Sequence, residues 1–151
     1  MNPKIIVLDP SKCSKCDDCI NKCKEVHGTS RIKKAGTVPV FCMQCENAPC
    51  MEICPVNAIY LKENITIVNE DKCISCGMCE IACPIGAIFI EDGIAHKCTL
   101  CMDTDRITPA CVEACKDNAL RFICNECLDM VKEERRNKLM KIISDEWREE
   151  I

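Results

Sequence analysis

The chain contains 151 residues, of which 18 are cysteines, and it carries a formal net charge of −4. Aromatic residues make up only 3% of the sequence, which argues against nucleic-acid binding because such surfaces combine a basic face with stacking rings. So few aromatic side chains also leave little bulk for a conventional core. We therefore expect metal clusters to fill the centre of the molecule and to supply much of its folding free energy.

This density of cysteines is typical of either a disulfide scaffold or a metal protein. A disulfide scaffold needs export, yet the apolar run at residues 5–8 is shorter than the core of a signal peptide and ends at Asp9. No segment approaches the roughly 18 apolar residues of a membrane span. We therefore expect no direct membrane span and a reducing, cytoplasmic location, although a partner with a twin-arginine leader could carry the chain out.

The first group of cysteines is spaced C-x2-C-x2-C-x3-C and consists of Cys13, Cys16, Cys19 and Cys23. Glycines and basic side chains in the next segment, residues 24–41, predict a loop with a basic tip formed by Arg31, Lys33 and Lys34. This tip could dock a partner or be a plain solvated loop. The lone His27 in the same segment is not predicted to be a ligand.

Three further groups of four follow along the chain. The second is spaced C-x2-C-x4-C-x3-C, the third repeats the spacing of the first, and the fourth is spaced C-x2-C-x9-C-x3-C. The three residues before the last cysteine of each group predict a single helical turn. In chain order, the members are Cys42, Cys45, Cys50 and Cys54; Cys73, Cys76, Cys79 and Cys83; and Cys98, Cys101, Cys111 and Cys115.

The flanks of the groups repeat as well. Similar segments follow the last cysteine of three groups, at residues 55–59, 84–88 and 116–120. Short β-like runs at 59–61 and 88–90, with partners at 65–68 and 93–95, predict small hairpins. A metal-free solenoid of hairpins would have no use for sixteen thiols at these offsets.

Four thiolates are the ligands of a [4Fe–4S] cluster, in which each iron needs one outside ligand. A C-x2-C-x2-C turn wraps three corners of the cube, and the fourth cysteine follows on a helical turn that leads away. This cysteine therefore serves the cluster of a partner motif, as in two-cluster bacterial ferredoxins. An all-cysteine zinc site is the alternative. The crowding of four cysteines into one short segment, and the prolines after Cys54 and Cys83, favour the cubane.

From about residue 5 to residue 123, the sequence resembles a known family. All four groups occur in the order found in the four-cluster electron-transfer subunits of the dimethyl-sulfoxide reductase beta-subunit type. The resemblance includes segments 44–50 (QCENAPC) and 97–101 (KCTLC). Small members accompany formate dehydrogenase, formate hydrogenlyase, carbon monoxide dehydrogenase and tungsten aldehyde oxidoreductases.

The resemblance implies an α+β fold of two interlocked bacterial-ferredoxin-like modules, with short β-hairpins and single-turn helices around four [4Fe–4S] clusters, plus a C-terminal α-helix. We expect residues 1–123 to form the four-cluster domain. Residues 124–151 would supply a C-x2-C pair and an amphipathic helix for subunit contact.

The resemblance also implies which cysteines share each cluster. The proposed sets are Cys13, Cys16 and Cys19 with Cys115; Cys98, Cys101 and Cys111 with Cys23; Cys42, Cys45 and Cys50 with Cys83; and Cys73, Cys76 and Cys79 with Cys54. Because no cysteine is missing, no three-iron cluster is expected. Lys24 and Lys116 replace proline after Cys23 and Cys115, where they could place positive charge near a negative cluster or simply be solvated.

Two cysteines, Cys124 and Cys127, lie outside the four groups. We consider them half of an interfacial metal site, completed by a second copy or a partner subunit and holding a further cluster or a zinc ion. Two free structural thiols and a redox dithiol are the alternatives. The tail from residue 128 to residue 151 has no Gly or Pro and predicts a helix. Its apolar stripe of Met140, Ile143, Trp147 and Ile151 suits a contact with another subunit.

No catalytic set, phosphate loop or nucleotide fingerprint is present in the sequence. His96 could hydrogen-bond near a cluster or lie at the surface. We therefore expect an electron-transfer subunit, not itself an enzyme, that joins a catalytic oxidoreductase subunit to a second redox protein in an anaerobic, cytoplasmic hetero-oligomer. A free polyferredoxin is the nearest alternative, and an iron–sulfur sensor or structural metal protein is a more distant one.

Overall fold

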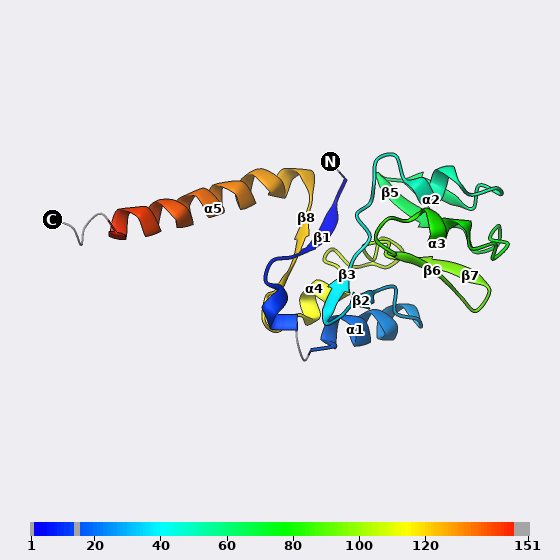
Figure 1. Ribbon diagram of the computed structural model, residues 1–151, viewed down its shortest axis with the longest axis horizontal. Coiled ribbons are helices and arrows are strands. Elements are labelled where there is room, and N and C mark those ends of the chain that lie inside the picture. The colour runs from blue at the N-terminus through cyan, green and yellow to red at the C-terminus, as the bar shows by residue number, and fades with distance from the viewer. Residues whose placement is uncertain (1, 14–15, 147–151) are drawn as a thin grey trace.

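The computed structural model describes residues 2–13 and 16–146, except for the side chains at 125–128, 131, 135, 145 and 146. Eight short strands, five α-helices and one short 3-10 helix (Pro10–Cys13) are defined in these residues (Figure 1). The strands are β1 (Lys4–Val7), β2 (Lys33–Ala35), β3 (Val38–Val40), β4 (Ile59–Lys62), β5 (Ile65–Val68), β6 (Ile88–Glu91), β7 (Ile94–Lys97) and β8 (Leu120–Ile123). The helices are α1 (Asp18–His27), α2 (Pro49–Glu52), α3 (Met78–Ala82), α4 (Ala110–Ala114) and α5 (Asn125–Glu146).

The strands form two-stranded antiparallel sheets. The pairs β4–β5 and β6–β7 are the predicted hairpins, and each is closed by two residues with positive φ. These residues are Glu63 and Asn64 in one turn and Asp92 and Gly93 in the other, a backbone that matches the twist of the flanking strands. The pair β1–β8 instead joins segments from near the start of the chain and from just before α5, with Ile5 opposite Phe122.

The predicted single helical turns are confirmed as α2, α3 and α4. The prediction of a loop over residues 24–41 is wrong in two places. Helix α1 continues past Cys23 to His27 and is capped by Gly28 with φ 78°, and the pair β2–β3 occupies much of the remainder. Lys24 permits this extension, whereas the proline after Cys54 or Cys83 cannot continue a helix.

The described residues before α5 form two halves, which differ in how the chain forms them. The inner half, residues 42–97, packs α2 against α3 beside the hairpins β4–β5 and β6–β7. The outer half, residues 2–41 and 98–123, packs α1 against α4 beside β1–β8. Each half has a buried apolar cluster, represented by Ile59 and Ile88 in the inner half and by Ile5 and Leu120 in the outer half. This arrangement is an α+β ferredoxin-like fold.

Helix α5 extends away from both halves (Figure 1). At its base, Arg121 of β8 and Glu134 form an ion pair of 3.0 Å. Apolar side chains of this helix are exposed, including Met130, Leu139 and Met140. The predicted helix is thus found over the described part of the tail, while Trp147 and Ile151 lie outside the described residues. No helix in the described part of the chain is long and apolar enough to cross a membrane.

Candidate iron–sulfur sites

Cysteines from different sequence groups line three of the cavities in the structure. In the first, Cys83 from the third group joins Cys42, Cys45 and Cys50 from the second. The second brings Cys54 to Cys73, Cys76 and Cys79, and the third brings Cys115 to Cys13, Cys16 and Cys19. In each cavity, three cysteines of one group meet the last cysteine of another.

The remaining four cysteines of the groups, Cys23, Cys98, Cys101 and Cys111, are buried together in the outer half. Burial raises the pKa of Cys111, and a negative charge on Cys98, Cys101 or Cys23 would raise it further by electrostatic repulsion. The other three cysteines therefore lie close to Cys111. The same repulsion links Cys98 to Cys23. These cysteines therefore form a fourth set, with three members from the fourth group and Cys23 from the first.

The last cysteine of three groups lies in one recurring turn. The backbone N–H groups of Ala58, Ala87 and Ala119 each donate a hydrogen bond of 3.3 Å to the sulfur of the cysteine four residues before. The residue that directly precedes each alanine in the chain has positive φ and donates its N–H to the carbonyl oxygen of the same cysteine. Such donors stabilise a thiolate and a negatively charged cluster bound to it.

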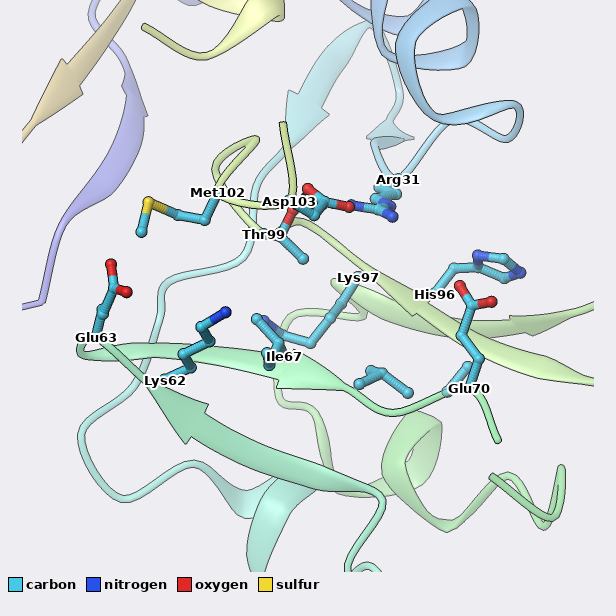
Figure 2. A pocket seen from close by; sticks show the side chains of 12 residues that line it. Arg31, Lys62, Glu63, Ile67, Glu70, His96, Lys97, Thr99, Met102 and Asp103 are labelled. Carbon is cyan, nitrogen blue, oxygen red and sulfur yellow. Dashed lines mark hydrogen bonds and ion pairs between the residues drawn. The ribbon is translucent and has the colours of Figure 1, made fainter. Parts of the chain in front are cut away.

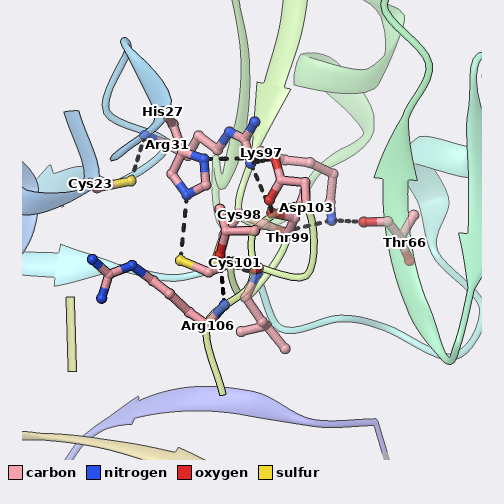
Figure 3. A network of polar contacts seen from close by, with 12 residues as sticks. Cys23, His27, Arg31, Thr66, Lys97, Cys98, Thr99, Cys101, Asp103 and Arg106 are labelled. Atoms are coloured by element: carbon pink, nitrogen blue, oxygen red, sulfur yellow. Dashed lines mark hydrogen bonds and ion pairs between the residues drawn. The ribbon is translucent and has the colours of Figure 1, made fainter. Parts of the chain in front are cut away.

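Cys23 has a different donor because α1 continues past it. The backbone N–H of Arg31 donates a hydrogen bond of 3.3 Å to the Cys23 sulfur. The Arg31 guanidinium donates to Thr99 and Asp103, both at 2.8 Å, and so holds this segment against the loop that carries Cys98 and Cys101 (Figure 3). Part of the predicted basic tip is therefore structural.

His27 lies beside a candidate ligand, which its isolated position in the sequence did not indicate. Its Nε2 is 3.4 Å from the sulfur of Cys101, and its Nδ1 is 3.7 Å from Oδ2 of Asp103 (Figure 3). A metal-bound thiolate has no proton, so the imidazole must be the donor in this contact. His96, by contrast, contacts the carbonyl oxygen of Glu91 at 3.1 Å and stacks on Phe89.

Three polar residues are buried where the inner half meets the outer half. Gln44 and Thr66 are each 1% exposed, and Lys97 is 2% exposed. The Gln44 side chain donates to the carbonyl oxygen of Cys98 at 2.8 Å and accepts the Thr66 N–H at 3.1 Å. Sequence reasoning missed this network because glutamine, threonine and lysine are ordinary surface residues.

The Thr66 hydroxyl tests whether the first cavity suits a cluster. Thr66 lines the cavity with Cys42, Cys45, Cys50 and Cys83, and its Oγ1 is buried without a hydrogen-bond partner among the described residues. A buried hydroxyl without a partner is costly. A cluster sulfur or its thiolate would accept this hydrogen, so the side chains present fit such a group.

Most of the buried cysteine thiols must lose a proton before they can bind metal. Burial raises the pKa of Cys19 and of Cys50 to about 11 and that of Cys98 to about 12. For Cys54, burial also acts to raise the pKa, but backbone N–H groups including that of Ala58 outweigh it and lower the pKa. Most of these thiols thus retain their protons near neutral pH, and metal binding must release them.

No group of three or more Cys, His, Asp or Glu side chains in the described residues is arranged to hold a single metal ion.

A further cavity, of about 230 Å³, has no cysteine in its lining (Figure 2). Charged side chains of both signs surround it, among them Arg31, Lys62, Glu63 and Glu70. Its position beside β5 and β7 places it next to the buried polar network, because Lys97 also lines it.

The structure describes only part of the pair formed by Cys124 and Cys127, which lies outside the four groups. Cys124 is disulfide-bonded in the structure and is therefore not a free thiol there. Cys127 lies in the first turn of α5, and its side chain is outside the described set. A metal site at this pair would require the reduced form and stays a prediction.

Comparison with known proteins gives a consistent result. A family model for a 4Fe-4S dicluster domain matches residues 33–125. The chain is 67% identical to an uncharacterized ferredoxin of Methanocaldococcus jannaschii over the full length of both proteins. It is 32% identical to hydrogenase-4 component A of Escherichia coli, over 88% of this chain and 89% of that protein. It is 34% identical to the thiosulfate reductase electron transfer subunit of Salmonella typhi, over 80% and 76%.

The family match covers more than half of the chain and includes the second, third and fourth cysteine groups. The three relatives are a ferredoxin, a hydrogenase component and an electron-transfer subunit. The chain therefore belongs to the 4Fe-4S dicluster family and is a multi-cluster, ferredoxin-type electron-transfer protein.

Proposed function

We propose that the sixteen grouped cysteines hold four [4Fe–4S] clusters and that the chain relays electrons between a catalytic oxidoreductase subunit and a second redox protein. The observation that carries this proposal is the arrangement of the cysteines, since each set of four combines three members of one group with the last member of another. When bound, each cluster accepts and donates one electron. The protein supplies the thiolates, the N–H donors and the positions.

The proposed clusters form a row. Cys79 and Cys50 lie in one apolar cluster, which joins the two sets of the inner half. Cys19, Cys98 and Cys111 lie in a second apolar cluster, and Cys42 from the inner half packs against it. The row therefore runs from the Cys54 set through the Cys42 set and the Cys98 set to the Cys13 set. This order supports a relay, because each site is adjacent to the next.

The partner belongs to the proposal as a class. Two of the relatives are named as a hydrogenase component and as a thiosulfate reductase electron transfer subunit. Together with the exposed side chains of α5, these names support a hetero-oligomer with a catalytic subunit, for which we keep a cytoplasmic location as part of the proposal. Carbon monoxide dehydrogenase, formate dehydrogenase, hydrogenase and aldehyde oxidoreductase are the candidates. We assign no catalysis to the chain alone, because every grouped cysteine is used to hold a cluster.

A free polyferredoxin is the second candidate. The relative that matches over the full length of both proteins is named a ferredoxin. Anaerobic size-exclusion chromatography of a native extract distinguishes the two. The relay subunit would elute with a larger redox enzyme, whereas a free carrier would elute as a small protein of about its own mass.

Iron and sulfide analysis of the anaerobically purified protein tests the cluster number. Four cubanes require roughly 16 irons per chain. A value that corresponds to three cubanes or fewer would contradict the proposal.

The crossing of the fourth cysteine is tested by comparing Cys83→Ala with Cys79→Ala. If Cys83 serves the second group, its replacement should leave Cys42, Cys45 and Cys50 open to alkylation while the cysteines of the third group stay protected. Cys79→Ala should expose Cys73 and Cys76 instead. Mass spectrometry of the alkylated peptides gives the answer, and exposure of the third group in Cys83→Ala would refute the crossing.

A further inference from the structure

Lys97, the last residue of β7, is a buried cation whose three donors all point to neutral groups. Its Nζ donates to the carbonyl oxygen of Thr66 (Figure 3) and to that of Cys98 at 3.1 Å. It also donates to Oε1 of Gln44 at 3.4 Å. Gln44 is itself fixed, because its amide nitrogen donates to the same Cys98 carbonyl oxygen and its Oε1 accepts the Thr66 N–H. The ammonium group is therefore held in one place.

No carboxylate in the described part of the chain forms an ion pair with Lys97, although many surface lysines and arginines have one. A buried charge without a counter-charge is strongly unfavourable, because hydrogen bonds to neutral carbonyl groups replace only part of its hydration. Glu63, Glu70 and Asp103 line the polar cavity that Lys97 also lines, but none of them forms an ion pair with it, so another group must supply the negative charge. An oxidised cubane with four thiolates has a net charge of roughly −2, and reduction adds one more negative charge.

Lys97 lies between two of the proposed cluster sites. It lines the cavity of Cys42, Cys45, Cys50 and Cys83, and it directly precedes Cys98 in the neighbouring set. Burial raises the pKa of Cys50 in one set and of Cys98 in the other, and the positive charge of Lys97 acts to lower both pKa values. These two sites are also the ones at which an electron passes from the inner half to the outer half.

We propose that Lys97, held by Gln44 and Thr66, is the shared counter-cation of the two middle clusters and raises the reduction potential of both. The inference rests on the proposed cluster sites. Reduction places one electron on a cluster, and a fixed positive charge beside it stabilises the reduced state more than the oxidised state. The middle of the row thus holds an electron more readily than it would without Lys97, while the two end clusters are unaffected.

The test is an EPR-monitored redox titration of the cluster-loaded, full-length protein and its Lys97→Met variant, which removes the charge and keeps an unbranched side chain one heavy atom shorter. Two of the four clusters should shift to more negative midpoint potentials. We expect at least a tenfold change in the ratio of reduced to oxidised cluster at a fixed potential, which is about 59 mV for a one-electron couple. Lys97→Arg retains the charge and should shift much less.

Lys116 is the control for an exposed charge near a cluster site. It directly follows the candidate ligand Cys115 and lines the cavity of that set, as Lys97 does in its own set, but its side chain is 84% exposed and paired with Asp18 at 3.4 Å. Water and salt screen an exposed charge, so Lys116→Met should leave all four midpoint potentials unchanged. A Lys97→Met protein with four clusters at wild-type potentials, or with all four shifted equally, would overturn the inference.

Gln44→Glu provides the same test if Lys97→Met does not assemble. This isosteric change places a carboxylate against the retained ammonium group and neutralises its field, so the same two potentials should fall. Unchanged potentials in an assembled Gln44→Glu protein, or failure of both variants to bind clusters, would give the network a structural role only and overturn the inference. Iron analysis of the wild-type protein tests the cluster sites separately.

Discussion

Alanine occupies the fourth position after the last cysteine in three groups, at Ala58, Ala87 and Ala119. All three alanines are buried, and their N–H groups contact the cysteine sulfurs. Each is preceded by a residue with positive φ, a conformation that asparagine and glycine adopt most readily. The recurring Asn-Ala or Gly-Ala pair is therefore a way to turn the backbone toward a thiolate, which explains why these flanks repeat.

His27 gives a prediction at the same scale. Replacing it with leucine removes the donor to the Cys101 sulfur and should lower the midpoint potential of one cluster, because hydrogen bonds to ligand sulfurs stabilise the reduced state. An EPR-monitored titration measures this potential. The control is His96→Leu, since His96 contacts a backbone oxygen and a ring instead of a cysteine. Equal shifts in both variants would show that His27 has no specific role.

At the scale of elements, β1 and β8 complete the outer half by pairing residues from opposite ends of the cluster-binding region. Ile5 is 2% exposed in the apolar cluster of that half, whereas its neighbour Ile6 is only half-buried. The strand therefore contributes to stability mainly through Ile5.

We expect Ile5→Ala to cost about 3 kcal/mol, within the range for truncating a buried isoleucine. Ile6→Ala should cost much less, because its side chain retains contact with water in the folded state. Anaerobic urea titration, followed by the loss of cluster absorbance, compares the two variants with the wild type. The same midpoint for both would contradict the placement of Ile5 in the core.

Helix α5 leads to a different prediction, because it leaves the body of the molecule. Deleting residues 129–151 should release the chain from its complex and leave its iron content unchanged. A milder change, Leu139→Gln with Met140→Gln, removes exposed apolar surface while keeping good helix formers. Lys132→Gln is the control on the same helix. Anaerobic size-exclusion chromatography with iron analysis reads both properties, and loss of iron on deletion would assign α5 to the cluster domain.

The sequence predicted elements best where local chemistry decides them. Spacing and turn residues were enough for α2, α3, α4 and the hairpins of the inner half, because each forms within a few residues. The extension of α1 and the pair β1–β8 were not predicted. Lys24 permits the extension but does not dictate it, since α4 ends at Ala114 although Lys116 also replaces proline. The pair β1–β8 depends on partners more than 100 residues apart. The contacts of His27 and Lys97 are equally non-local, so no pattern in their own segments indicated them.

For the whole molecule, the four cysteine sets differ in their exposure. Every member of the set formed by Cys23, Cys98, Cys101 and Cys111 is buried. The two sets of the inner half each include an exposed cysteine, Cys45 in one and Cys76 in the other. Oxidants and solvent therefore reach the inner half first.

This difference predicts an order of cluster loss. On controlled exposure to an oxidant such as ferricyanide, the set with four buried cysteines should survive longest. Alkylation at time intervals, followed by mass spectrometry, should label Cys45 and Cys76 early and Cys98 and Cys111 late. The cluster-free protein, in which all thiols should be labelled together after unfolding, serves as the reference. Early labelling of Cys98 would contradict the predicted order.

The pairing of β1 with β8 also has a consequence for biosynthesis. During translation, Cys13, Cys16 and Cys19 leave the ribosome early, but Cys115 and the strand that closes their half emerge only near the end. The inner half, in contrast, is contiguous over residues 42–97 and has all eight of its cysteines before the outer half can close. The first thiols to be made are thus among the last to be enclosed, and the cell must keep them reduced and free of stray metal for most of the time that the chain is being synthesised.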